Sequence, residues 1–139
     1  MLQKIKGIIE SLETAYIFEY EESAMMNVKV DKYQRGDKFV YIEEFRSGKI
    51  FEGRYGGNRK QMRMQIYFCK FSKMHGNAIE REAQRETILN EIVYRFIDAY
   101  KSSGYFEQVP EWNIYYPLPR FDANEVSVML EFNCILPQC

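Results

Sequence analysis

The sequence is poor in the side chains that most often carry out catalysis. It has one histidine, His75, and only three cysteines, Cys69, Cys134 and Cys139. A general base needs a partner that orients it, and no serine or cysteine near His75 has the sequence context of a nucleophile. One histidine with scattered cysteines cannot supply a closed zinc-ligand set at known spacing. We therefore expect no enzyme activity, no metal and no cofactor, and we interpret His75 as an ordinary loop residue.

Long hydrophobic runs and a net charge are also missing. No stretch approaches the about 20 apolar residues that cross a bilayer, and residues 1–12 lack the continuous apolar core of a signal peptide. The net charge of −1 gives no overall attraction to nucleic acid or to an anionic membrane. The cysteines are odd in number and widely spaced, so we expect Cys69 and Cys134 to be buried thiols inside strands of an intracellular protein.

What the chain does have is an ordinary globular composition with many aromatic side chains. Hydrophobic residues make up 46% and charged residues 28%, and 139 residues suit a single domain, 1–139. Aromatic residues reach 16%, with 11 tyrosines. Tyrosine combines apolar area with a polar tip and is common at subunit interfaces. Together with the low net charge, this composition favours self-association.

Hydrophobic spacing of about 3.6 residues predicts two helices. A short N-terminal helix, which Gly7 weakens by about 1 kcal/mol relative to alanine, is indicated by Leu2, Ile5, Ile8, Ile9 and Leu12. A long amphipathic helix over about 78–101 is indicated by Leu89, Ile92, Val93, Phe96, Ile97 and Tyr100. Asn77 with Glu80 suits its N-cap, and Gly104 suits a left-handed end. Glu82 and Glu86 are interpreted as its solvated face.

Alternating apolar and polar residues predict the strands. We expect strands at 16–22, 39–45, 61–71, 112–116 and 126–136, and a strand or a loop at 27–33. Strands, a long helix and further strands in this order are typical of an α+β domain. The predicted fold is an antiparallel or mixed sheet, with the long helix and the short N-terminal helix packed on one face.

Charge is distributed unevenly along the chain. Residues 46–60, called the basic arm below, hold four glycines and a single acid, together with Arg46, Lys49, Arg54, Arg59 and Lys60. This composition predicts a long exposed hairpin or a flexible arm. Residues 10–22 have the opposite bias, because they hold five glutamates, among them Glu19, Glu21 and Glu22, and no basic residue.

Three interpretations of the basic arm remain open from the residues alone. The arm, extended to residues 46–63, could bind nucleic acid, with Phe51 and Tyr55 stacking on bases among the cations. It could instead meet the acidic segment of a neighbouring copy in a head-to-tail contact that closes into a ring. The third interpretation is a solvated loop without a partner.

The order of segments resembles that of the bacteriophage tail-terminator, or tail-completion, proteins, which are minor tail proteins of phages and prophages. The likeness covers nearly the whole chain: an early helix and strand, a strand at 39–43 and a long strand at 62–71. A turn then leads to a helix rich in acidic and arginine residues at 80–101. A loop with proline and aromatic residues follows, and a polar turn introduces the last strand, as in 121–128. The basic arm is more basic than this pattern leads us to expect.

The resemblance implies a structural function without covalent chemistry. It implies an α+β subunit that forms a ring, a hexamer on the tail tube, ends tail polymerisation and offers a docking surface to the head or neck. The expected partners are the chain itself, tail-tube proteins and head–neck proteins, first in the bacterial cytoplasm and then in the virion tail. The expected assembly surface consists of Arg46, Lys49, Arg54, Arg59, Lys60, Glu19, Glu21 and Glu22. A small nucleic-acid-binding module that uses residues 46–63 is the alternative.

Overall fold

The computed structural model describes residues 2–14, 16–19, 38–42, 47–71, 78–107, 111–117 and 125–135. Several predictions of the sequence analysis lie outside these residues, namely the N-cap Asn77, the loop histidine His75, the strand or loop at 27–33 and the third cysteine, Cys139. Within the part of the chain that is described, no helix is long and apolar enough to span a bilayer.

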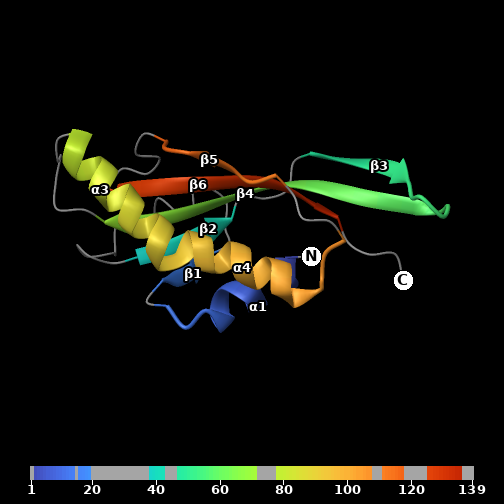
Figure 1. The fold of residues 1–139 in the computed structure, drawn as a ribbon, viewed down its shortest axis with the longest axis horizontal. Helices are drawn as coiled ribbons and strands as arrows, with labels where there is room; N and C mark the ends of the chain where they lie inside the picture. Colours follow the sequence, from blue (N-terminus) through green and yellow to red (C-terminus); the bar gives the residue numbers. More distant parts are fainter. Residues whose placement is uncertain are drawn as a thin grey trace.

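The described strands form one mixed sheet of six (Figure 1). They are β1 (Ile17–Glu19), β2 (Lys38–Ile42), β3 (Gly48–Glu52), β4 (Asn58–Phe71), β5 (Asn113–Tyr115) and β6 (Glu125–Ile135). The strand order is β1-β2-β4-β6-β5, and β3 also pairs with β4. The β1–β2 pair is parallel, and the other pairs are antiparallel. The predicted α+β fold is confirmed.

Both predicted helices are present on one face of the sheet (Figure 1). Helix α1 spans Leu2–Ser11. The long helix consists of α3 (Ala78–Ile88), a π-helical turn η1 (Leu89–Val93) and α4 (Tyr94–Ser103). It ends at Gly104, whose φ of 71° and ψ of 6° are left-handed, as the sequence predicted. The π-helical turn was not predicted, because hydrophobic spacing does not distinguish one wide turn from the α-helical turns around it.

Strand β4 is the centre of the sheet. One of its edges pairs with β6 from Gln61 to Phe71. Its other edge pairs first with β3, over residues 58–62, and then with β2, over residues 66–70. Because β3 supplies backbone partners to residues 58–60, β4 begins three residues before the predicted start at 61.

The core lies between the sheet and the helices. The buried side chains of α1, the long helix, β4 and β6 include Ile5, Ile9, Ile88, Ile92, Phe96, Met64, Ile66, Phe68, Val128 and Phe132. Phe96 is the hub of an aromatic cluster, with ring centroids of Phe68 and Phe132 at 6.0 Å and that of Trp112 at 6.4 Å. Edge-to-face and tilted contacts of this kind add to the stability that apolar burial provides.

The other face of the sheet is also buried where β2 borders β4. Phe39, Tyr41, Tyr67 and Cys69 point to that face and are at most 6% exposed. The predicted fold covered only one face of the sheet, with the helices, so this second buried region was not predicted. Cys69 and Cys134 are buried thiols that form no disulfide, which confirms the prediction for these two residues. Burial raises the pKa of the Cys134 thiol to about 12.

Candidate assembly surfaces

The basic arm forms a β-hairpin, one of the two forms that the sequence left open. Strand β3, residues 53–57 and the first part of β4 are called the hairpin below. Its turn is closed by hydrogen bonds from the Gly53 amide to the Gly57 carbonyl (2.9 Å) and from the Gly56 amide to the Gly53 carbonyl (3.0 Å). Gly56 and Gly57 have φ angles of 84° and 80°, which glycine adopts without steric strain. The glycines of the arm therefore build a defined turn.

The hairpin extends beyond the rest of the sheet. Residues 58–60 of β4 pair with β3, but the ladder with β6 ends where Gln61 meets Ile135. The tip is therefore a two-stranded ribbon that projects from one end of the molecule (Figure 1). Two of its large hydrophobic side chains face solvent, Ile50 with 73% and Tyr55 with 89% of their area exposed.

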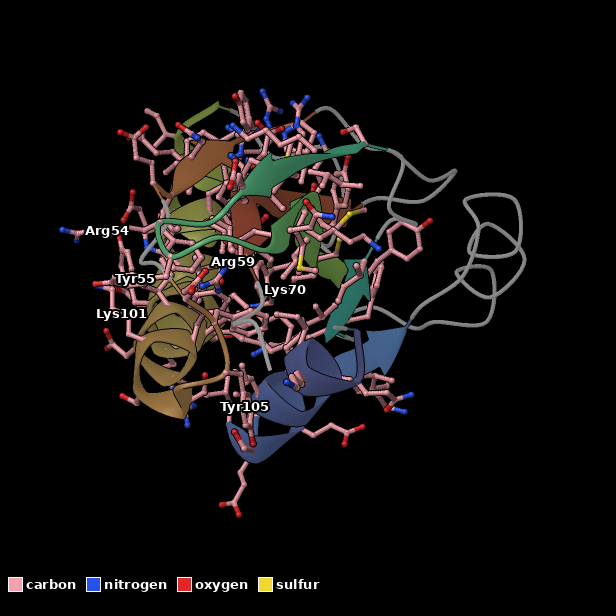
Figure 2. All side chains as sticks on the ribbon, turned by 90° about the vertical axis from the view of Figure 1, so that its right-hand side faces the viewer. Arg54, Tyr55, Arg59, Lys70, Lys101 and Tyr105 are labelled. Atoms are coloured by element: carbon pink, nitrogen blue, oxygen red, sulfur yellow. The ribbon has the colours of Figure 1, made fainter. Side chains whose placement is uncertain are left out.

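Three of the predicted cations lie on the hairpin without an ion pair to any other described residue. Lys49 places its ammonium group 5.9 Å from the ring centroid of Phe51, and the Arg54 guanidinium lies 5.8 Å from the ring centroid of Tyr55. Lys60 is exposed, opposite Ile50 in the β3–β4 register. Figure 2, with the hairpin end toward the viewer, shows Arg54 extending away from the ribbon. The tip thus combines positive charge with exposed apolar area.

Arg59 differs from these three cations because it is engaged within the subunit. Its guanidinium forms an ion pair with Glu107, just after α4, and its side chain is only 14% exposed. The Glu107 amide in turn donates a hydrogen bond to the Ile135 carbonyl at the end of β6 (2.8 Å). Arg59 also lies against Gly53 of the turn, where an added Cβ would be 2.7 Å from its Nε. Its position suits a residue that fastens the hairpin to the body.

The structure describes only one of the remaining predicted assembly residues. Arg46, Glu21 and Glu22 are outside the described residues. Glu19 is the last residue of β1, and its backbone lies opposite Tyr41 of β2. Of these three glutamates the structure describes only the backbone of Glu19, so the acidic segment as an assembly surface stays a prediction.

A second exposed surface, which the sequence analysis interpreted only as a solvated helix face, lies on the long helix. We call it the helix stripe, and it consists of Ile79, Glu82, Glu86, Tyr94 and Tyr116. Spacings of three and four residues put Ile79, Glu82 and Glu86 on one side of α3. Tyr94 comes eight residues after Glu86, beyond η1, and it and Glu86 both act on Tyr116. Tyr116, which follows β5, lies beside them: burial raises the pKa of its hydroxyl, and the charge of Glu86 raises it further. The exposed fractions are 77% for Ile79, 49% for Tyr94 and 43% for Tyr116.

The helix stripe carries unpaired negative charge. Glu82 and Glu86 are exposed, and neither forms an ion pair with another residue in the described ranges. The cation nearest to the tyrosine is Arg85, whose guanidinium lies 5.0 Å from the ring centroid of Tyr116. An aliphatic and two aromatic side chains therefore surround two carboxylates. The sequence analysis did not predict the helix stripe because Tyr116 is brought to the helix only by the tertiary structure.

A third polar arrangement lies on the sheet face away from the helices. Arg63 and Gln65 of β4 both donate hydrogen bonds to Oε2 of Glu131 in β6, at 2.6 Å and 2.9 Å. Burial alone would raise the pKa of Glu131, but the bonds from Arg63 and Gln65 hold it below its usual value. The group is a cross-strand network whose members satisfy one another, so we assign it a structural role.

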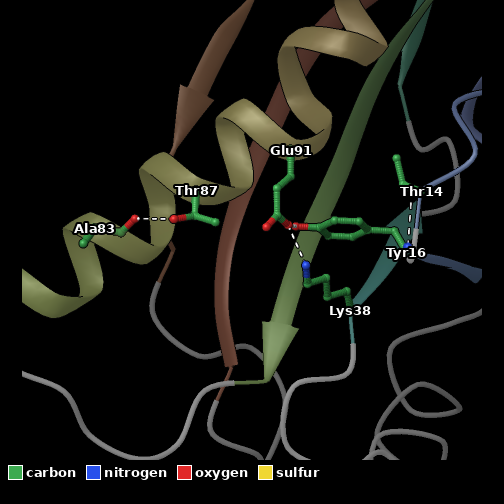
Figure 3. A network of polar contacts seen from close by, with 6 residues as sticks. All are labelled: Thr14, Tyr16, Lys38, Ala83, Thr87 and Glu91. Atoms are coloured by element: carbon green, nitrogen blue, oxygen red, sulfur yellow. Dashed lines mark hydrogen bonds and ion pairs between the residues drawn. The ribbon is translucent and has the colours of Figure 1, made fainter.

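A fourth polar network connects the π-helical turn with the start of the sheet (Figure 3). Oε2 of Glu91 accepts hydrogen bonds from the Lys38 ammonium group (2.8 Å) and from the Tyr16 hydroxyl (3.1 Å). Burial alone would raise the pKa of Glu91, but these two donors hold it below its usual value. Burial also raises the pKa of Tyr16, and the charge of Glu91 adds to that rise. The network fastens the long helix to β2 and to the residue that precedes β1.

None of these arrangements has the form of a catalytic or metal site. Among the described residues, no three histidine, cysteine, aspartate or glutamate side chains gather where they could hold a metal ion. Neither a scan against protein-family models nor a search of curated proteins found a match to the chain. The hairpin and the helix stripe are the two surfaces described above that expose large apolar side chains beside charged groups.

Proposed function

We propose that the protein is a structural subunit of a phage or prophage tail, which forms a ring on the end of the tail tube. The ring ends tube polymerisation and offers its opposite face to the head or neck. The observation that carries this proposal is the hairpin, which projects past the sheet and exposes Ile50, Tyr55 and three cations without an ion pair to other described residues. The order of segments, which resembles that of tail-terminator proteins, supports it.

The hairpin tip is a two-stranded ribbon that lacks the support of the rest of the sheet. Two strands without a third strand or a covering helix are at best marginally stable in water, and exposed strand edges readily pair with other chains. The hairpin tip combines this geometry with exposed apolar side chains. A contact with another subunit would bury the apolar area and neutralise the cations. The hairpin is therefore better suited to an assembly than to a monomer.

A ring explains how such a contact can end a polymer. Head-to-tail contacts between identical subunits close into a ring when a whole number of the rotations between neighbours adds up to a full turn. A ring that matches the open end of a tube on one face, but presents a different opposite face, leaves no surface on which a further tube subunit can add. This function needs shape and charge complementarity and no covalent chemistry.

One observation favours a nucleic-acid-binding module as the second candidate. Tyr55 is 89% exposed and has the Arg54 guanidinium 5.8 Å from its ring centroid, an arrangement on which an unpaired base could stack. The pairing of Arg59 with Glu107 works against this candidate, because it leaves fewer cations available to phosphates. We therefore place it second.

The proposal is tested by measuring mass in solution by light scattering over a concentration series, with negative-stain images of the largest species. We expect rings with a central hole, either free or on the ends of tail tubes from the same phage or prophage. His75→Ala should leave ring formation unchanged. A protein that stays monomeric and does not bind tube ends contradicts the proposal. Salt-sensitive binding to single- or double-stranded DNA, weakened by Arg54→Ala and Lys60→Ala, would favour the second candidate instead.

A further inference from the structure

The hairpin and the α3 part of the helix stripe lie toward opposite ends of the molecule. In Figure 1 the hairpin is at one end of the long axis and the first turns of α3 are at the other. Each surface joins exposed apolar side chains to charge: the hairpin carries cations, and the helix stripe carries Glu82 and Glu86, with the single cation Arg85 against Tyr116. Because the two surfaces are so far apart, a subunit cannot bring its own hairpin to its own helix stripe.

We propose that the helix stripe of one subunit is the docking surface for the hairpin of a second copy of this chain. This inference rests on the proposed ring function and identifies the second half of the contact that such a ring needs. It assigns the basic arm a different partner from the acidic segment around Glu19, Glu21 and Glu22, which stays an untested prediction. The residues assigned to the contact are Arg54, Tyr55, Ile50 and Lys60 on one side and Ile79, Glu82, Glu86 and Tyr116 on the other.

Charge complementarity is the first argument for a second copy as the partner. Arg54 and Lys60 of the hairpin and Glu82 and Glu86 of the helix stripe have no ion-pair partner among the described residues of their own subunit. Opposite potentials on the two faces would steer the encounter and disfavour hairpin–hairpin and stripe–stripe contacts, since like charges would then meet. A head-to-tail contact thus satisfies both surfaces, whereas a symmetric contact of either surface with itself satisfies neither.

Apolar complementarity is the second argument. Ile50 and Tyr55 are among the most exposed large hydrophobic side chains of the described residues, and so is Ile79. Stable interfaces have an apolar, often aromatic centre with a polar rim. In the proposed contact, Ile50 and Tyr55 would pack on Ile79 and Tyr116, and the four charged groups would surround them. Each subunit gives one hairpin and accepts one, so the contact repeats around a ring.

Charge reversal tests this inference directly. Arg54→Glu with Lys60→Glu reverses the charge at two positions of the hairpin. Glu82→Lys with Glu86→Lys reverses the charge at two positions of the helix stripe, so the net charge changes by the same amount in the opposite direction. We expect each double variant alone to weaken self-association by about tenfold or more, a modest loss for close charge pairs at an interface. The quadruple variant keeps the native net charge and should recover association. An equimolar mixture of the two double variants should recover it as well, because alternating subunits then present matching surfaces.

The matched control is Glu13→Lys with Glu111→Lys, two exposed acids outside the long helix and the helix stripe. This control changes the net charge as the helix-stripe variant does and should leave association unchanged. Light scattering and sedimentation measure the association, and circular dichroism verifies that each variant is folded.

The outcomes separate this inference from the proposed function. Rings that form equally well with Glu82→Lys and Glu86→Lys, or a quadruple variant that fails to recover, overturn the docking surface and leave the ring function standing. A native protein that neither self-associates nor binds tail-tube ends overturns both. DNA binding that responds to the hairpin variants, with no effect on association, also overturns the docking surface.

Discussion

Residues 66–70 of β4 are bordered by β2 on one side and β6 on the other, whereas residues 58–60 have only β3 beside them. In the first region both faces are covered, and Ile66, Tyr67, Phe68 and Cys69 are at most 6% exposed. In the second region Asn58 and Lys60 are exposed. One continuous strand therefore belongs to two different environments.

The difference shows where stability and recognition are located in this molecule. Apolar burial contributes about 25 cal/mol for each Å² removed from water, so the covered region holds most of the folding free energy. The hairpin buries little apolar area. Its exposed side chains are therefore not constrained by packing within the subunit. Variants in the two regions should therefore have clearly different effects.

The largest expected effect comes from the covered region. Phe96→Ala removes a fully buried ring that contacts Phe68, Trp112 and Phe132, and it should lower the free energy of unfolding by about 3–5 kcal/mol. Ile50→Ala, on the exposed hairpin, should change it by no more than about 0.5 kcal/mol. Urea denaturation measures both. If the two variants lost equal free energy of unfolding, the covered region would not be the main source of stability, and this comparison would be wrong.

A pair of glycine substitutions should have effects of opposite sign. A Cβ at position 48 would lie 2.5 Å from the Gln61 carbonyl oxygen, so Gly48→Ala should weaken the β3–β4 pairing by about 1–3 kcal/mol. Gly7 in α1 has no atom within 4 Å of an added Cβ. Gly7→Ala should therefore stabilise the protein by up to about 1 kcal/mol. Thermal unfolding gives the signs, and faster hydrogen exchange of hairpin amides in Gly48→Ala would locate the loss.

The Glu91 network should make stability depend on pH. The folded protein holds the pKa of Glu91 below its ordinary value of 4.5. The network therefore stabilises the fold fully above pH 4.5 and loses this effect as the pH falls through the lower folded value. Glu91→Gln should cost about 1 kcal/mol near pH 7, a modest effect because the carboxylate is partly exposed. The difference between native protein and variant should shrink toward pH 3. A difference that stays constant from pH 7 to pH 3 would show that the charge of Glu91 does not contribute.

The smallest expected effect concerns the fastening of the hairpin. A double-mutant cycle of Arg59→Ala and Glu107→Ala should give a coupling of about 0.2–1 kcal/mol, as is typical of pairs near the surface. Hydrogen exchange should accelerate in the hairpin and remain unchanged in β6 and α4. Faster exchange throughout the sheet would mean that Arg59 supports the body of the protein as well as the hairpin.

Periodicity predicted both helices and the described strands other than β3. The helix at 78–101, the strands at 61–71 and 126–136, and the left-handed end at Gly104 are local features, because they depend on neighbours within a few residues. The hairpin was one of two predicted forms of the basic arm. Its glycines could be recognised in the sequence, but the pairing partner of β3 could not.

Contacts between distant residues were not predictable from one sequence. Arg59 and Glu107 are 48 residues apart, and Tyr16 and Glu91 are 75 apart. Tyr116 reaches the long helix from beyond β5, and so the helix stripe was interpreted only as a solvated face. The burial of Phe39 and Tyr67 on the second face likewise depends on tertiary packing, which alternation cannot indicate.

The π-helical turn at Leu89–Val93 sets the direction in which the first part of the long helix faces. Such a turn contains one residue more than an α-helical turn, and each residue rotates an α-helix by about 100°. Deleting one residue there would give a regular helix, but with Phe96 and Tyr100 kept on the sheet it would swing Ile79, Glu82 and Glu86 sideways by about that angle. The extra residue therefore fixes the rotation of α3 relative to α4. A chain that lacked it could keep its core, but the exposed residues of α3 would face a different direction.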